Sequence, residues 1–140
     1  MIVVKETRDI ALCRDLRRQV FCVEQGISPA DELDAYDDIA RHFIAFLDGQ
    51  PVGTARVLIT GTNAKIGRVC VTAAARRRGI ATTLIRAALD RLRGLDGIAQ
   101  ATLGAQVSAQ GLYEAIGFRP VGGIFDDVGI PHQEMVLDLR

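Results

Sequence analysis

A turn rich in arginine and glycine, Arg76-Arg77-Arg78-Gly79-Ile80-Ala81, separates two segments with different hydrophobic patterns. The residues before it, Ile66 to Val71, are mostly the β-branched and apolar types of a buried strand. After the turn, apolar residues recur on one face of a helix, at Leu84, Ile85, Ala88, Leu89 and Leu92. The sequence therefore predicts a strand that leads into a helix N-terminus carrying three arginines.

These arginines stand where a helix normally prefers acids, because its first turn exposes unpaired N–H groups and a partial positive charge. A bound phosphate or pyrophosphate would compensate for this placement, and Gly79 would let its oxygens approach the backbone closely. The alternative is that the arginines are exposed, at a cost of about 0.3–1 kcal/mol each. Their position alone favours neither interpretation.

The size and charge of the chain indicate one ordinary globular domain, residues 1–140. Its 17 basic residues balance 17 acidic ones, which argues against a general nucleic-acid-binding or membrane-surface protein. The first residues, Met1 to Lys5, lack the apolar core of a signal peptide, and no apolar run approaches the length of a bilayer crossing. We therefore expect a cytoplasmic protein without a membrane partner.

The three cysteines, Cys13, Cys22 and Cys70, are odd in number and widely spaced. They are typical of buried apolar positions in a reducing compartment. We expect the fold to need neither a disulfide nor a metal.

The remaining pattern predicts the order strand, helix, three strands, helix, strand, helix, two strands. The expected elements are a strand at Ile2 to Val4, a helix at Asp9 to Val23, strands at His42 to Leu47, Val52 to Ile59 and Lys65 to Val71, the helix after the arginine turn, a strand at Ile98 to Ala105, a helix around Ala109 to Ile116, and strands at Phe118 to Phe125 and His132 to Leu139.

Gly26 to Ala40 is expected to be irregular and is rich in acids, namely Asp31, Glu32, Asp34, Asp37 and Asp38. These carboxylates could line a site for a cationic group. For most of them singly, a solvated loop or short helix is the commoner explanation. On the preceding helix, we expect Arg14, Arg17 and Arg18 to lie away from the apolar face.

Two motifs resemble the GNAT-family N-acetyltransferases. Arg76-x-x-Gly79-x-Ala81 after a strand is similar to the family's acetyl-CoA signature, and Gln106-x-x-Ala109-x-x-Leu112-Tyr113-x-x-x-Gly117-Phe118 is similar to its later helix. Shorter stretches, such as Phe21-x-x-Glu24-Gln25, resemble a small uncharacterised bacterial subgroup. The resemblance implies an α+β GNAT fold, with a central mixed, mostly antiparallel sheet flanked by helices.

The resemblance also implies acetyl-CoA as cosubstrate and direct attack by a primary amine of a small molecule. The residues it assigns to acetyl-CoA are Val69, Cys70, Val71, Arg76, Arg77, Arg78, Gly79, Ile80, Ala81, Thr82, Gln106 and Tyr113. Arg76 and Arg78 are expected nearest the phosphates, with Arg77 more exposed. Tyr113 would donate a proton to the CoA thiolate, whereas spacing alone favours a core aromatic.

One departure concerns the general base, a glutamate in many family members, which is replaced here by Gly67. The candidates for the base and for substrate contact are Glu24, His42 and His132, although a structural role is commoner for either histidine alone. Cys70 as an acyl nucleophile lacks a neighbour that would lower its pKa.

Two other functions stay open. The stretch from Phe21 through Asp34-x-x-Asp37 to Gly53-Thr54-Ala55-Arg56 is similar to acyl-homoserine-lactone synthases. The missing carboxylate at Gly67 suits a non-catalytic CoA-binding sensor. The final strands could also pair across a homodimer.

Overall fold

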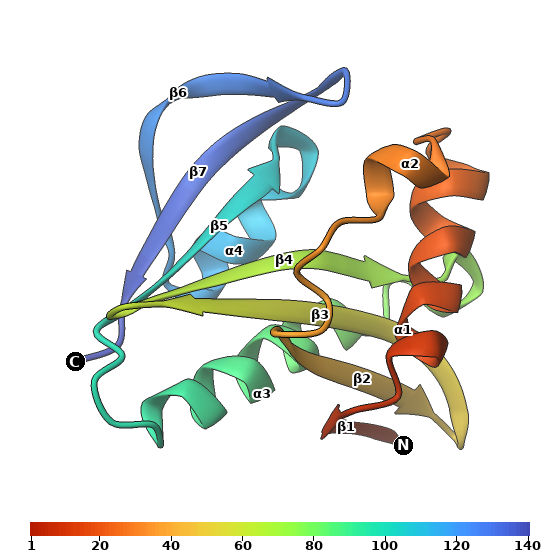
Figure 1. Ribbon diagram of the computed structural model, residues 1–140, viewed down its shortest axis with the longest axis horizontal. Coiled ribbons are helices and arrows are strands. Elements are labelled where there is room, and N and C mark those ends of the chain that lie inside the picture. Colours follow the sequence, from red (N-terminus) through yellow and green to blue (C-terminus); the bar gives the residue numbers. More distant parts are fainter.

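The computed structural model describes residues 1–140 and contains one mixed sheet with the strand order β1-β2-β3-β4-β5-β7-β6 (Figure 1). All neighbouring strands are antiparallel except β4 and β5, which run parallel. The strands are β1 (Ile2–Thr7), β2 (Arg41–Leu47), β3 (Gln50–Thr60), β4 (Asn63–Val71), β5 (Gln100–Gln106), β6 (Arg119–Asp127) and β7 (Ile130–Asp138).

Helices cover both faces of this sheet. They are α1 (Ile10–Arg17), which continues as the π-helical turn η1 (Arg18–Glu24), α2 (Pro29–Glu32), α3 (Ile80–Arg93) and α4 (Gln110–Ile116), with short 3-10 turns η2 (Ala73–Ala75) and η3 (Val107–Ala109). None of the helices combines the length and the apolar character that a membrane crossing needs.

The alternation of side chains along β2 explains how one strand supports both helical layers. Phe43 and Ala45 pack in the larger apolar cluster, which contains the buried face of α3. Ile44 packs in the smaller cluster, with Leu16 of α1 and Val20 of η1. In Figure 1, α1 and α2 accordingly lie on the near face of the sheet, and α3 and α4 on the far face.

The predicted order of elements and the α+β fold are confirmed. The first helix ends its α-helical part at Arg17 and continues with π-helical geometry, so its hydrogen bonds change register where the sequence predicts one continuous helix. Within the segment expected to be irregular, Ser28 caps a short helix that begins at Pro29, which suits the first turn because it has no N–H to satisfy.

Candidate active site

The parallel strands β4 and β5 separate along their length. Asn63–Ile66 of β4 pairs with Gln100–Leu103 of β5, and no pairing continues beyond Ile66 and Leu103. From Gly67 onward, the edge of β4 that faces β5 therefore has no strand partner. Backbone N–H and C=O groups on this unpaired edge are free to form hydrogen bonds with a ligand.

A β-bulge between β3 and β4 lies where β4 separates from β5. The β3–β4 register shifts between Thr54 and Arg56, and Arg68 on the opposite strand has a φ of 51°. A side chain in this left-handed region is strained, so the conformation needs support from its surroundings. The Arg68 guanidinium supplies it by donating to the Glu32 carbonyl at 2.9 Å and to the Asp34 carboxylate at 3.2 Å.

A cavity of about 550 Å³ occupies the gap between the separated strands. Most residues assigned to acetyl-CoA line it, namely Val69, Cys70, Val71, Arg76, Arg77, Gly79, Ile80, Ala81, Thr82, Gln106 and Tyr113. His132 lines it as well, whereas Arg78, Glu24 and His42 do not. Segments from both halves of the chain therefore meet around one space.

The N-terminus of α3 opens into this cavity without a side-chain cap. By contrast, Asp9 accepts from the Leu12 N–H of α1, and Ser28 accepts from the Asp31 N–H of α2. No hydrogen bond engages the backbone N–H groups of residues 77–82. Gly79 supports this turn with a φ of 75°, which favours glycine. The free N–H groups and the helix dipole together form an anion-binding arrangement.

The three arginines of the turn differ in their contacts. Arg76 donates to both carboxylate oxygens of Glu24 and, at 3.0 Å, to the carbonyl of Val71. Arg77 has a φ of 64° and lines the cavity, and Arg78 lies outside the lining. Glu24, which does not line the cavity, is thus joined by an ion pair to an arginine that does.

Tyr113 reaches the cavity from α4. Its side chain is 8% exposed and lies edge-on to Phe118, and no hydrogen bond engages its hydroxyl. Burial raises the pKa of Tyr113 to about 12. The phenol therefore keeps its proton at neutral pH, which suits a proton donor. Burial likewise raises the pKa of the Cys70 thiol to about 12, so it is a poor nucleophile.

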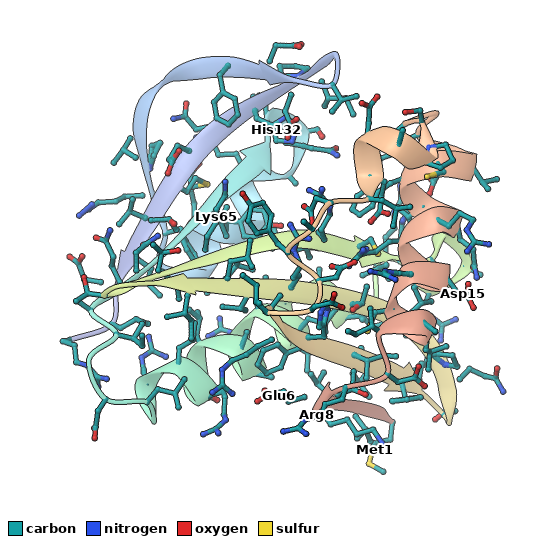
Figure 2. The ribbon with its side chains drawn as sticks, viewed as in Figure 1. Met1, Glu6, Arg8, Asp15, Lys65 and His132 are labelled. Carbon is teal, nitrogen blue, oxygen red and sulfur yellow. The ribbon has the colours of Figure 1, made fainter.

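His132 on β7 lines the cavity, and only one of its ring nitrogens forms a hydrogen bond. Its Nδ1 lies 2.7 Å from the Ile130 carbonyl and must donate to it, because a carbonyl oxygen only accepts. The neutral ring therefore carries its lone pair on Nε2, which lies 4.0 Å from the Asp127 carboxylate. Figure 2 shows His132 on β7, toward the end where β4 and β5 have separated. Nε2 can accept a proton, and Asp127 would stabilise the resulting charge.

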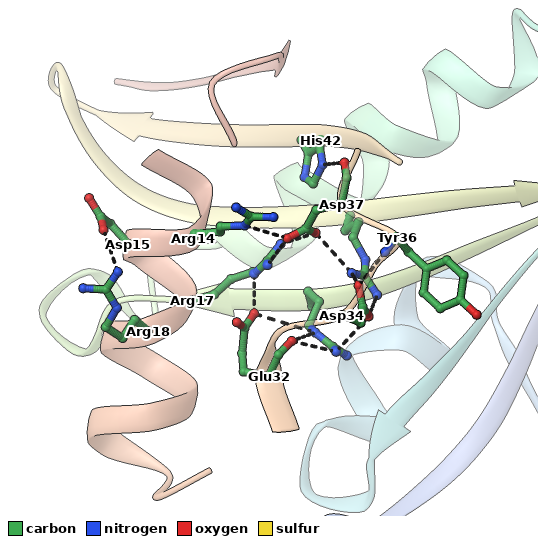
Figure 3. A network of polar contacts seen from close by, with 11 residues as sticks. Arg14, Asp15, Arg17, Arg18, Glu32, Asp34, Tyr36, Asp37 and His42 are labelled. Carbon is green, nitrogen blue, oxygen red and sulfur yellow. Dashed lines mark hydrogen bonds and ion pairs between the residues drawn. The ribbon is translucent and has the colours of Figure 1, made fainter. Parts of the chain in front are cut away.

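His42 lies elsewhere. Its side chain is 2% exposed on β2, and its Nε2 contacts the carbonyl of Asp37 at 2.8 Å (Figure 3). The Nδ1 atom is buried without a hydrogen-bond partner. This position, on the sheet face covered by α1, gives His42 no access to the cavity lining.

The acid-rich segment forms an ion-pair network with arginines from three other elements (Figure 3). Its carboxylates Glu32, Asp34 and Asp37 contact Arg14 and Arg17 of α1, Arg56 of β3 and Arg68 of β4. The single carboxylate of Asp37 accepts hydrogen bonds from Arg14, Arg17 and Arg56. These carboxylates are therefore already paired within the protein and do not form an open site for a cation.

Sequence reasoning missed this network. Arg17, expected away from the apolar face, is 1% exposed. A signal was present in Arg56, a single charge within the apolar run of β3, because a buried arginine needs a partner.

Comparison with known proteins supplies the family. The acetyltransferase (GNAT) domain family matches residues 17–139. The protein ElaA of Escherichia coli is 32% identical over 130 residues, covering 89% of this chain and 84% of ElaA. The crystal structure of ElaA has a TM-score of 0.85 at 28% identity, covering 97% of this chain and 99% of the ElaA chain.

Two further structures show how widely the fold is shared. An acyl-CoA N-acyltransferase from Pseudomonas aeruginosa has a TM-score of 0.83 at 30% identity, with 97% of each chain covered. The AHL synthase LasI has a TM-score of 0.80 at 16% identity, covering 100% of this chain and 91% of LasI. The likeness to LasI shows the fold alone.

Proposed function

The chain belongs to the GNAT acetyltransferase family, and on that premise we propose that it transfers an acetyl group from acetyl-CoA to a primary amine of a small molecule. The observation that carries this proposal is the arrangement of one cavity. At one place it is lined by the uncapped N-terminus of α3, and at another by Tyr113, whose ring is buried and whose hydroxyl has no hydrogen-bond partner in the protein. The first suits a pyrophosphate and the second a leaving thiolate.

In this mechanism, the free N–H groups of residues 77–82 bind the pyrophosphate of acetyl-CoA. The thioester then lies along the unpaired edge of β4, where a backbone N–H between Val69 and Val71 stabilises the negative charge that develops on its oxygen. Preorganised backbone donors are effective here because they need no reorganisation during the reaction.

Proton transfer is divided between two side chains. His132 Nε2 removes a proton from the attacking amine, and the Asp127 carboxylate stabilises the imidazolium that forms. Tyr113 donates its hydroxyl proton to the thiolate as the carbon–sulfur bond breaks. His132 thus replaces the carboxylate that Gly67 lacks.

The test is to follow free thiol release from acetyl-CoA with polyamines, amino acids, amino sugars and peptides. We expect release that depends on the amine. Release confined to acyl-carrier-protein thioesters would instead favour a lactone synthase. Binding of CoA without turnover of any amine would contradict the proposal and favour a CoA-binding sensor.

A further inference from the structure

A second cavity, of about 200 Å³, adjoins the first. The two cavities share three lining residues of β4, Lys65, Gly67 and Arg68. Gly67 has no side chain, and a Cβ placed there would meet no atom within 4 Å. The space above Gly67 is therefore open, and a ligand can lie across it from one cavity to the other.

Three of the seven residues that line the second cavity are cations. Lys65, Arg56 and Arg68 face a single carboxylate, Asp34, which already accepts two hydrogen bonds from Arg56. The side chain of Lys65 forms no ion pair or hydrogen bond within the protein. Arg68 donates through Nε and Nη2, and its Nη1 atom has no partner. Burial and the nearby charge of Arg56 lower the pKa of Arg68, so an added anion would relieve an unfavourable environment.

The first cavity also has groups in its lining that can contact a cation. These include the acids Asp31 and Asp127, and His132, whose Nε2 lies 4.0 Å from the Asp127 carboxylate. Lys65 lies in the paired part of β4, opposite Thr102, whereas His132 lies opposite Gln106 of β5, where β4 and β5 have separated (Figure 2). The acids and His132 of the first cavity therefore suit an ammonium group, and the cations of the second cavity suit an anion.

From this juxtaposition, and resting on the proposed function, we propose that the acceptor is an amine that also carries an anionic group. Its ammonium lies near His132 and Asp127, and its anion lies between Lys65 Nζ and Arg68 Nη1. The ring of Tyr36, 53% exposed at the second cavity, provides an apolar surface for the rest of the molecule. A carboxylate and a phosphate both fit this chemistry.

The test compares amines that differ only in the anion. γ-Aminobutyrate is measured against n-butylamine, and phosphoethanolamine against ethanolamine, which distinguishes a carboxylate from a phosphate. Because hydrogen bonds to charged groups are strong, we expect kcat/KM to be about tenfold higher for the anionic member of at least one pair. Lys65→Gln should reduce that preference and Lys65→Glu should reverse it. Lys5→Gln, the matched change at the other lysine of the chain, should leave it unchanged.

Binding provides a second readout that does not require turnover. Calorimetry on CoA-saturated protein should show tighter binding of the anionic amine to the wild type than to Lys65→Glu. Equal affinities for these two proteins would overturn the inference. Equal kcat/KM within both pairs would also overturn it, while leaving acetyl transfer intact. Anion-dependent binding without acetylation of any amine would support the subsite and contradict the proposed function.

Discussion

Arg17 and Asp37 form a two-point ion pair in which both side chains are 1% exposed. Leaving one charge of such a pair unpaired is costly, so Asp37→Asn should lower the free energy of unfolding by about 3–5 kcal/mol. Chemical denaturation measures this change. Asp38→Asn, at an exposed position of the same segment, is the matched control and should change stability by less than about 0.5 kcal/mol.

The ion pair between Arg17 and Asp37 also makes the free energy of unfolding depend on pH in the acid range. Burial would raise the pKa of Asp37, but hydrogen bonds from Arg17 and Arg14 outweigh it and hold that pKa below the ordinary value. A lowered folded-state pKa stabilises the protein above the unfolded-state value of about 4, and this contribution is lost as pH falls further. Wild-type stability should therefore decline below about pH 4, and the decline should be shallower in Asp37→Asn. Parallel declines would contradict this account of Asp37.

Under the proposed function, the ion pair between Glu24 and Arg76 would compete with acetyl-CoA for one guanidinium. Glu24→Gln should therefore tighten CoA binding several-fold at low salt, because Arg76 becomes free to contact phosphate. Titration calorimetry measures the affinity, with Glu114→Gln as the control. A loss of turnover in Glu24→Gln with unchanged CoA affinity would instead support Glu24 as a catalytic residue.

Tyr113→Phe should lower kcat by about a hundredfold while CoA affinity stays constant, because the phenol acts only as sulfur departs. Steady-state kinetics and CoA titration separate the two effects. In Tyr36→Phe, Tyr113 is the remaining tyrosine, and its phenolate absorbance should rise near pH 12. Its raised folded-state pKa also means that its stabilising contribution is present below about pH 10 and is lost as pH rises through 12. Wild-type turnover by Tyr113→Phe would exclude the proton-donor role.

His132→Gln should lower kcat/KM by about a hundredfold, since the amine loses its proton acceptor. Added imidazole should restore part of the rate by entering the space that the ring vacates. Asp127→Asn should lower kcat/KM by a smaller factor than His132→Gln, because it removes only the negative charge that stabilises the imidazolium of His132. Full activity in His132→Gln would exclude His132 as the base.

The order of helices and strands could be predicted because it depends on local sequence patterns. Period-two and helical patterns, with turns such as Asp48-Gly49, identify strands and helices without reference to distant residues. The GNAT fold that the motifs imply is confirmed. The roles assigned to Tyr113 and the arginine turn stay predictions, although the fold brings these segments together.

Long-range pairings could not be predicted in the same way. The position at which β4 leaves β5 depends on register, which no local pattern fixes. His42 could be placed on a strand, but its burial depends on the Asp37 segment that covers it. The partners of Arg17 lie 15 and 20 residues away, in a segment whose own pattern indicates an acidic loop.

The central claim is that acetyl-CoA bound at the α3 N-terminus donates its acetyl group to an amine. The most direct measurement is joint quantification of free CoA and acetylated amine formed by the wild type and by Gly79→Glu, which places a negative charge in the proposed pyrophosphate site. Gly61→Glu makes the same change at another left-handed glycine, φ 61°, in the β3–β4 turn. Gly79→Asn keeps a residue that tolerates this conformation.

We predict that the wild type, Gly61→Glu and Gly79→Asn each form one molecule of acetylated amine for each molecule of CoA released. Folded Gly79→Glu should form neither product. CoA released without acetylated amine, or product formed by Gly79→Glu at the wild-type rate, would contradict the account.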